Sequence, residues 1–302
     1  MILFYLSLKD KNHKSPIATE EKLGNTDIVS VLVNKKQNLK IKNNIMENIK
    51  DLLQKIEKEK NITILYACET GSRAWGFPSP DSDYDVRFIY MHNRDWYLSL
   101  SERKDTIEVM DGDWDITGWD LKKSLMLLKK SNAPLIERFN SPIEYFNEGN
   151  FKVAFMELIE ACYSPIAVYF HHYSLAKKLW EDLKDADDIK LKSYFYLIRS
   201  LLSCNWAVKN KSILPMDIES LMTLIEDETR NRIRKLIKLK ATVGEKYLHP
   251  KDNYLNTWIE KLWLEIEQQK AKLEIRNADF KLLDNFFLKL INEHADNRND
   301  KK

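Results

Sequence analysis

Two aspartates two residues apart, Asp83 and Asp85, constrain this chain more than any other feature. They open segment 83–90, in which polar and apolar residues alternate as in a β-strand, so both carboxylates would lie on one face. Carboxylates held this close repel each other, and a divalent cation between them removes the repulsion. Carboxylate oxygens suit Mg²⁺ or Mn²⁺. The pattern therefore predicts a strand that carries a metal site.

A sharp turn is predicted shortly before these aspartates. Segment 62–68 is a short run of apolar and β-branched residues that predicts a strand. Gly71 and Ser72 end it, because a residue without a Cβ lets the backbone turn and lets a ligand approach the main chain. Backbone N–H groups at the start of a short helix here could bind phosphate, with help from the Ser72 hydroxyl. The prolines and serines of 78–82 predict a loop.

Two arginines flank this unit. Arg73 follows the turn and could neutralise phosphate charge. Arg87 lies on the same predicted strand face as Asp85, and two interpretations stay open: it contacts phosphate, or it pairs with the carboxylates. A calcium loop starting at Asp81 is excluded, since its sixth and twelfth positions are Val86 and His92 rather than Gly and Glu.

A third carboxylate is expected from a hairpin over 105–119. Asp111-Gly112 is a favoured two-residue hairpin turn, and Asp120 is suited to cap the helix that follows. Asp113 and Asp115 share one face of the return strand. Asp115 has apolar neighbours on both sides that would fix it inside the sheet, whereas Asp113 lies at the strand's end. We therefore predict Asp115 as the third metal ligand and as the group that takes the proton of an attacking hydroxyl.

The whole chain has a globular composition, with 302 residues, 44% apolar and 31% charged. A net charge of +2 gives no overall sign of nucleic-acid binding. The three cysteines have no metal-ligand spacing and fit buried thiols in a reducing compartment. No apolar run approaches the length of a membrane span, and no secretory signal is evident at the start. The cytoplasm is the expected location.

Periodicity divides the chain into a mixed part and a helical part. An amphipathic helix is expected over 40–59 and another over 120–130. From residue 134 onward the pattern is almost entirely helical, which indicates an α+β protein with a helical second domain. The helices are expected at about 134–139, 150–161, 165–184, 189–209, 217–225, 228–248, 252–274 and 276–294.

The string Gly71-Ser-Arg-Ala-Trp-Gly-Phe-Pro-Ser-Pro-Asp-Ser-Asp-Tyr-Asp-Val-Arg-Phe-Ile-Tyr90 resembles a known family. Gly-Ser, ten residues and Asp-x-Asp form the signature of the polymerase-β-type nucleotidyltransferases. The full string is similar to the predicted bacterial branch associated with RNA repair, and the similarity runs from about 46 to 247. The resemblance implies a nucleotidyltransferase-like mixed sheet flanked by helices, and it matches an Asp of the family to Asp115.

The resemblance implies a helical side to the site as well. Lys192 and Arg199 lie on one helical face with Tyr196, Ser203 and Trp206. A similar run in the family implies that this face lines the cleft opposite the carboxylates, where Lys192 and Arg199 would meet triphosphate or acceptor. An equally open interpretation is that the aromatic residues of this face pack in the core and that its basic residues pair with neighbouring groups. The adjacent His171 and His172 predict packing rather than metal binding, because neighbours on a helix point in different directions.

The expected domains are a poorly ordered appendage over 1–40, a catalytic domain over 41–148, a helical domain over 149–295 and a polar tail over 296–302. The expected activity is Mg²⁺- or Mn²⁺-dependent transfer of a nucleoside monophosphate from a triphosphate, such as ATP, to an acceptor hydroxyl. The resemblance implies an RNA end as acceptor. The alternatives are a binding module without turnover, such as an antitoxin or nucleotide sensor, and transfer to a small molecule or a protein.

A basic stripe is the candidate surface for RNA. Between Glu228 and Lys251 the chain has eight basic residues and two acidic ones. Such a stripe could follow a phosphate backbone, or it could be a solvated helix face. The basic residues are Arg230, Arg232, Arg234, Lys235, Lys238, Lys240, Lys246 and Lys251. The sequence does not decide which triphosphate is used or the oligomeric state.

Overall fold

A computed structural model describes residues 44–276 and 278–299. The predicted N-terminal appendage lies outside the described residues, as do residues 300–302. The chain divides into two compact units, 1–52 and 53–302, and the predicted domain boundary after residue 148 falls inside the second. A helix occupies 44–60, close to the predicted 40–59.

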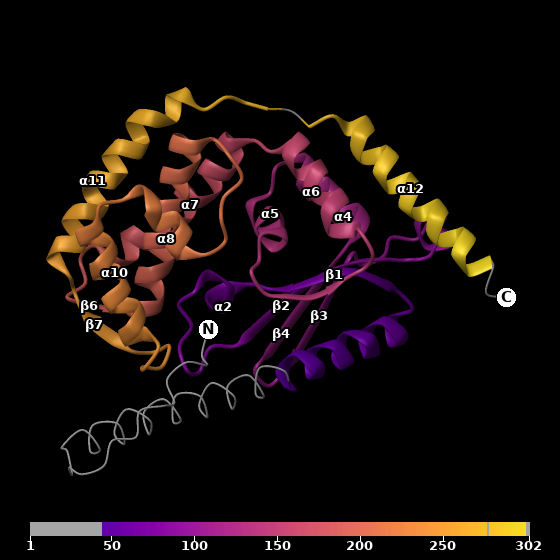
Figure 1. Cartoon of the computed structure of the whole chain (residues 1–302), viewed down its shortest axis with the longest axis horizontal. Coiled ribbons are helices and arrows are strands. Elements are labelled where there is room, and N and C mark those ends of the chain that lie inside the picture. Colours follow the sequence, from indigo (N-terminus) through magenta and orange to yellow (C-terminus); the bar gives the residue numbers. More distant parts are fainter. Residues whose placement is uncertain (1–43, 277, 300–302) are drawn as a thin grey trace, which may run out of the picture. The chain divides into compact units, whose positions relative to one another are not determined.

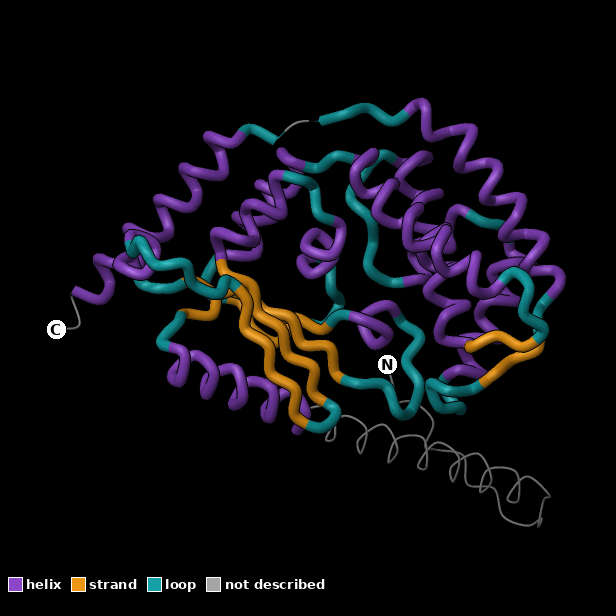
Figure 2. The backbone as a smooth tube through the Cα atoms, turned by 180° about the vertical axis from the view of Figure 1, so that it is seen from behind, coloured by secondary structure: helices purple, strands orange, loops and turns teal. Residues whose placement is uncertain are grey.

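The centre of the second unit is a five-stranded mixed sheet, as Figure 2 shows. The strand order is β3-β4-β2-β1-β5, with β2 and β4 parallel and the other neighbours antiparallel. This sheet and the helices around and after it confirm the predicted α+β class. The strands are β1 (Thr63–Glu69), β2 (Tyr84–Met91), β3 (Thr106–Asp111), β4 (Trp114–Asp120) and β5 (Glu144–Asn147).

Helices α4, α5 and α6 contact the sheet, and α7, α8, α10 and α11 gather beyond its edge (Figure 1). The predicted cap is confirmed, because the Asp120 carboxylate accepts a hydrogen bond from the Lys122 backbone N–H at 2.8 Å. The helices are α2 (Gly71–Trp75), α3 (Arg94–Leu98), α4 (Leu121–Lys129), α5 (Ala133–Phe139), α6 (Phe151–Cys162), α7 (Pro165–Leu183), α8 (Leu191–Asn210), α9 (Ile218–Leu221), α10 (Asp227–Lys240), α11 (Asn253–Gln269) and α12 (Phe280–Asn299), with 3₁₀ turns η1 (Met222–Leu224) and η2 (Lys270–Lys272).

Three sequence predictions differ from the structure. Strand β5 was not predicted, because four residues are too few to show a period. A two-stranded ladder, β6 (Asp188–Lys190) with β7 (Leu248–Pro250), replaces the ends of two predicted helices. Helix α10 ends at Lys240 and not near 248, and the chain after it turns at Gly244, where an added Cβ would lie 3.0 Å from the Asp81 carboxylate. Only a glycine allows this approach without displacing Asp81.

Stacked aromatic rings join the sheet to the helices. Phe139 of α5 stacks on Tyr66 of β1 at 4.8 Å between ring centroids and on Phe155 of α6 at 4.3 Å. Beyond α2, Phe77 stacks on Phe195 of α8 at 4.9 Å. Each such pair contributes roughly 0.5–1.5 kcal/mol beyond its buried area. The Phe77–Phe195 pair ties the loop before Asp83 to α8.

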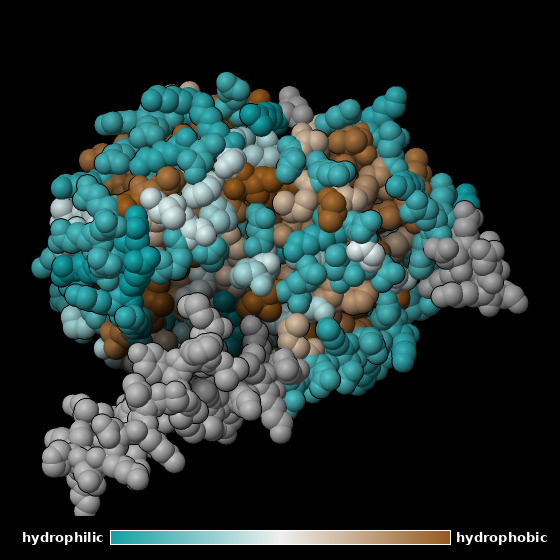
Figure 3. All heavy atoms as spheres, in the orientation of Figure 1, coloured by the Kyte–Doolittle hydropathy of each residue, from teal (hydrophilic) through white to brown (hydrophobic). Residues whose placement is uncertain are grey.

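Polar side chains cover the visible faces of α10 and α11, as expected of helices with one side in solvent (Figure 3). Within the described ranges, no single helix has both the length and the apolar composition that crossing a membrane requires. Helices α6 and α7 meet that test only when taken together, across a 91° bend.

Candidate active site

The predicted turn lies directly against Asp85. Gly71 adopts a positive φ of 61°, a conformation that favours glycine. A Cβ added there would lie 2.0 Å from Asp85 Oδ2, far inside van der Waals contact. Thr70 holds the turn in place, since its backbone N–H and its hydroxyl both donate to the Asp85 carbonyl, at 2.9 and 3.0 Å. The glycine therefore provides the space that the Asp85 carboxylate occupies.

Asp85 and Asp115 are register partners on the parallel strands β2 and β4. Arg87 bridges them: its Nη2 lies 3.0 Å from Asp85 Oδ1 and 2.8 Å from Asp115 Oδ2. Its Nη1 also donates to the Asp115 carbonyl at 2.7 Å. Of the two interpretations of Arg87, this structure has the one in which it pairs with carboxylates. Burial raises the pKa of Asp85, and Arg87 acts against that rise.

Asp83 precedes β2 and is exposed to solvent. Its loop is held by Arg73, which donates to the carbonyls of Ser82 at 2.6 Å and Asp83 at 3.1 Å and lies 3.9 Å from the centre of the Tyr84 ring. Asp113 belongs to the hairpin turn, which consists of Gly112 and Asp113 rather than the predicted Asp111 and Gly112. The structure thus brings Asp85 and Asp115 together on neighbouring strands. Asp83 and Asp113 are exposed, the first in the loop before β2 and the second in the hairpin turn.

A buried glutamate, Glu69, supports this pair and was not predicted. It ends β1 fully buried, accepts from the Asp85 backbone N–H at 2.7 Å and is hydrogen-bonded by the Tyr145 hydroxyl. Burial raises the pKa of Glu69 to about 7, although these two hydrogen bonds oppose the rise. A glutamate directly before Thr70-Gly71, at the end of an otherwise apolar strand, is the sequence signal that could have revealed it.

Glu69 should make stability depend on pH. A carboxyl whose pKa is raised in the folded state from 4.5 to about 7 stays protonated over a range where the unfolded chain loses its proton. The free energy of unfolding therefore falls as pH rises through this range, by roughly 2–3 kcal/mol. Glu69→Gln keeps an acceptor for Asp85 and should remove this component. Chemical denaturation of both proteins between pH 5 and 8 tests this, and parallel pH curves for the two would contradict it.

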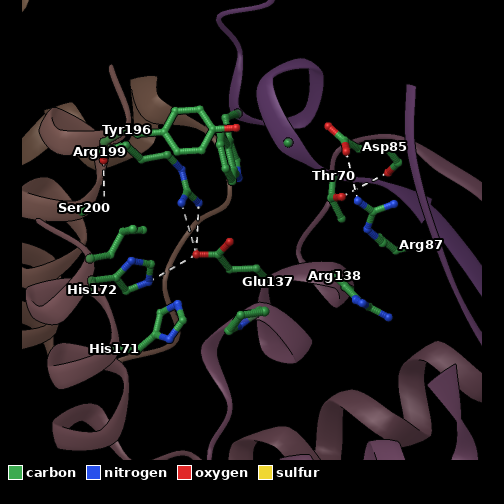
Figure 4. Close-up of a pocket in the computed structure, with 14 residues that line it drawn as sticks. Thr70, Asp85, Arg87, Glu137, Arg138, His171, His172, Tyr196, Arg199 and Ser200 are labelled. Atoms are coloured by element: carbon green, nitrogen blue, oxygen red, sulfur yellow. Dashed lines mark hydrogen bonds and ion pairs between the residues drawn. The ribbon is translucent and has the colours of Figure 1, made fainter. Parts of the chain in front are cut away.

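A cleft of about 310 Å³ opens beside Asp85. Figure 4 shows Thr70, Asp85 and Arg87 on one side and residues of α7 and α8 on the other, with Glu137 between them. Of the predicted residues, Gly71, Asp85, Arg87 and Arg199 line this cleft, whereas Ser72, Arg73, Asp83, Asp115 and Lys192 do not. Unpredicted lining residues include Trp75, Glu137 and Arg138, and Tyr196 lines the cleft as expected of its helical face.

Arg199 is part of a buried charge cluster. It lies 3.2 Å from Glu137, donates to the Met216 carbonyl and covers the Trp75 ring at 4.4 Å. His172, from the pair predicted to pack, is buried and lies 3.3 Å from the same Glu137 oxygen. Burial alone would raise the pKa of Glu137, but Arg199 and His172 outweigh it and lower the pKa to about 2. Glu137 is thus ionised and holds Arg199 at the cleft wall.

Lys192 and three of the eight basic residues of the stripe pair with acidic side chains. Lys192 Nζ lies 2.6 Å from Glu245, which also accepts from the Ser82 hydroxyl at 3.0 Å. In the stripe, Arg230, Arg232 and Arg234 pair with Asp227, Asp252 and Glu219 at 2.7–2.8 Å. Lys240 is buried against the Ser79 hydroxyl, and Lys251 donates to the Lys184 carbonyl. Lys235, Lys238 and Lys246 are exposed and make no ion pair with any described residue.

The comparison with protein families decides which group of proteins this geometry belongs to. Residues 45–289 match the sequence profile of RlaP, the RNA repair pathway DNA polymerase beta family. The chain belongs to this family. It is therefore a member of the polymerase-β-type nucleotidyltransferase superfamily, which the Gly-Ser and Asp-x-Asp string had indicated.

Two individual proteins are similar to parts of this chain. An uncharacterized protein of Bacillus subtilis strain 168, YcgL, is 36% identical over 236 residues, which are 77% of this chain and 91% of YcgL. A nucleotidyltransferase-like protein from Exiguobacterium sibiricum 255-15 aligns over 74% of this chain and 75% of its own, with 10% identity and a TM-score of 0.27.

Asp85 and Asp115 are the residues that could hold a divalent cation at this site. Within residues 44–276 and 278–299, no three acidic, histidine or cysteine side chains already form a metal-binding group. Mg²⁺ is commonly held by only one or two carboxylates, with substrate phosphates completing its shell. The two register partners supply that many oxygen donors on one face, so they fit such an ion if it replaces Arg87 Nη2, which lies between them in this structure.

Proposed function

We propose that this protein transfers a nucleoside monophosphate from a nucleoside triphosphate to an acceptor hydroxyl and releases pyrophosphate. The observation that carries the proposal is the placement of Asp85 and Asp115 as register partners beside a glycine turn that could accommodate no side chain. Membership in the polymerase-β-type superfamily supports the same chemistry.

The reaction needs little covalent chemistry from the protein. The acceptor oxygen forms a bond to the α-phosphorus, the bond from that phosphorus to the β-phosphate oxygen breaks, and the acceptor proton passes to the Asp115 carboxylate. Asp83, Asp85 and Asp115 would hold Mg²⁺ or Mn²⁺, which when bound stabilises negative charge on the reacting oxygens. Glu69 and Thr70 hold the main chain of Asp85 rigidly, which supports such a site.

The triphosphate is assigned to the cleft between α2 and α8. The Gly71 backbone and the Arg199 guanidinium, which line the cleft, would contact the phosphates, with help from the Ser72 backbone beside it. Arg73 and Arg87 would support this binding by fixing the loop before Asp83 and the carboxylate pair. Lys192, which pairs with Glu245 in this structure, would exchange that partner for a phosphate. Tyr196 and Trp75, whose rings meet edge to face at 4.9 Å, offer apolar surface for the base.

The proposed acceptor is an RNA end, as the family description suggests. The test is to incubate purified protein with Mg²⁺, each α-labelled triphosphate in turn, and either total RNA, protein or small hydroxyl compounds. We expect label to enter RNA. Label in protein or in a small molecule alone would contradict the RNA acceptor, and label in no acceptor would favour the binding-module alternative.

RNA affinity should depend only moderately on salt. With three exposed and unpaired lysines in the stripe, the logarithm of the binding constant should fall with log[salt] with a slope of about −2, at roughly 0.7 per neutralised phosphate. A slope near −4 would mean that Arg230, Arg232 and Arg234 exchange their acidic partners for phosphates. Filter binding at several salt concentrations decides this, and Lys235→Gln should reduce the slope more than Arg234→Gln.

A further inference from the structure

A second pocket, of about 410 Å³, lies in the helical region among α8, η1, α10 and α11. It shares no lining residue with the cleft beside Asp85. Its volume lies in the range of small-molecule sites.

An unpartnered amide lines this second pocket. Asn205 of α8 is 1% exposed, and neither its Nδ2 nor its Oδ1 has a hydrogen-bond partner among the described residues. Asn256 of α11 differs, because it accepts from the Tyr194 hydroxyl at 2.8 Å. An unpaired buried amide costs about 1–3 kcal/mol of stability. A ligand that offers a donor next to an acceptor would recover that free energy.

Aromatic and hydroxyl groups form a second part of the lining. Tyr254 and Trp258 lie one helical turn apart on α11, and both are half-buried. The Tyr254 hydroxyl lies 3.1 Å from the Thr229 hydroxyl of α10, which fixes the position of the ring. Flat, partly exposed aromatic surfaces of this kind bind planar rings by stacking.

The charges around the pocket cancel. Two exposed lysines and two exposed glutamates line it, and none makes an ion pair with another described residue. The inserted part of a ligand should therefore be neutral, while either lysine could contact an attached phosphate. The four residues are Lys209, Lys261, Glu226 and Glu265.

We propose that this pocket binds a nucleobase, whose neutral ring would stack on Tyr254 or Trp258 and whose donor–acceptor edge would pair with the Asn205 amide. Asparagine recognises adenine in this bidentate way, by accepting from its exocyclic amine and donating to a ring nitrogen. The base belongs either to a free nucleoside or to an unpaired position of an RNA strand. This inference does not require turnover, so it is independent of the proposed transfer reaction.

The test is equilibrium binding of adenosine and of single-stranded oligoadenylate, measured by calorimetry in chelator so that no transfer occurs. Asn205→Leu removes the amide at nearly constant size and should weaken binding about tenfold or more. It should not lower the melting temperature, since it removes an unpaired polar group. Ser203→Ala is the matched control, because Ser203 on the same helix is also buried and unpartnered but lies outside the pocket.

The outcomes are distinct. Weaker binding in Asn205→Leu, with normal binding in Ser203→Ala and Asp85→Asn, supports the site. Purine riboside, which lacks the exocyclic amine, should bind at least several-fold more weakly than adenosine. If both adenosine and oligoadenylate bind, the pocket accepts the base of a free nucleoside. If only oligoadenylate binds, the base comes from an RNA strand. Binding of neither ligand at millimolar concentration, or equal binding by wild type and Asn205→Leu, would overturn the proposal.

Discussion

Gly71→Ala is expected to remove nearly all transfer activity. The added methyl would lie 2.0 Å from Asp85 Oδ2, so the carboxylate or the turn must move by more than 1 Å. A misplacement of about 1 Å at a reacting centre costs about a hundredfold in rate. Steady-state kinetics should show this loss in kcat.

Gly112→Ala is the matched control for this substitution. Gly112 has a similar φ, 57° against 61°, but no atom of the described residues lies within 4 Å of a Cβ added there. Both variants bear the backbone cost of about 1–2 kcal/mol for a non-glycine residue in this conformation. Only Gly71→Ala adds the clash. Equal kinetic effects in the two would contradict the assignment of Gly71 as the residue that makes room for Asp85.

Asp115→Asn is expected to lower kcat by about a hundredfold or more, which corresponds to about 3 kcal/mol of transition-state stabilisation. The substitution keeps the size of the side chain but removes the group proposed to take the acceptor proton. Triphosphate should still bind with Mg²⁺, through Asp85 and Asp83. Calorimetric binding and kinetics on the same variant separate these two effects.

Asp113→Asn provides the comparison. It removes the same charge two residues away, in an exposed turn, and should leave kcat within about twofold of wild type. Asp83→Asn and Asp85→Asn should both resemble Asp115→Asn. An inactive Asp113→Asn with an active Asp115→Asn would mean that the metal and acceptor lie at the hairpin turn and not between β2 and β4.

Local patterns predicted the strands that carry the aspartates well. Alternation identified β2 and β4, and the flanking apolar residues of Asp115 placed it inside the sheet, where it is the register partner of Asp85. The glycine turn and the Asp120 cap follow from local backbone requirements that a single sequence displays. The parallel pairing of β2 with β4 was not evident, because no local pattern specifies which strands become neighbours.

The features that the sequence did not predict depend on contacts between residues that are far apart in the chain. Arg234 pairs with Glu219 and Arg232 with Asp252, so part of the positive charge of the stripe is neutralised by acids outside it. Likewise Arg199 meets Glu137, 62 residues away, and that pairing defines the cleft wall. Burial of Glu69 depends on β5, a strand too short to show a period. Charge counted along the chain could reveal none of these contacts.

The most direct test of the proposed chemistry is which phosphate reaches the acceptor. Purified protein, Mg²⁺ and the acceptor that takes up label are incubated in parallel with triphosphate labelled at the α- or at the γ-phosphate. We expect the α-label to become covalently attached and the γ-label to appear only in pyrophosphate, with both signals lost in Asp85→Asn. Attachment of the γ-label, or release of the γ-label as inorganic phosphate without α-label transfer, would contradict nucleotidyl transfer at this site.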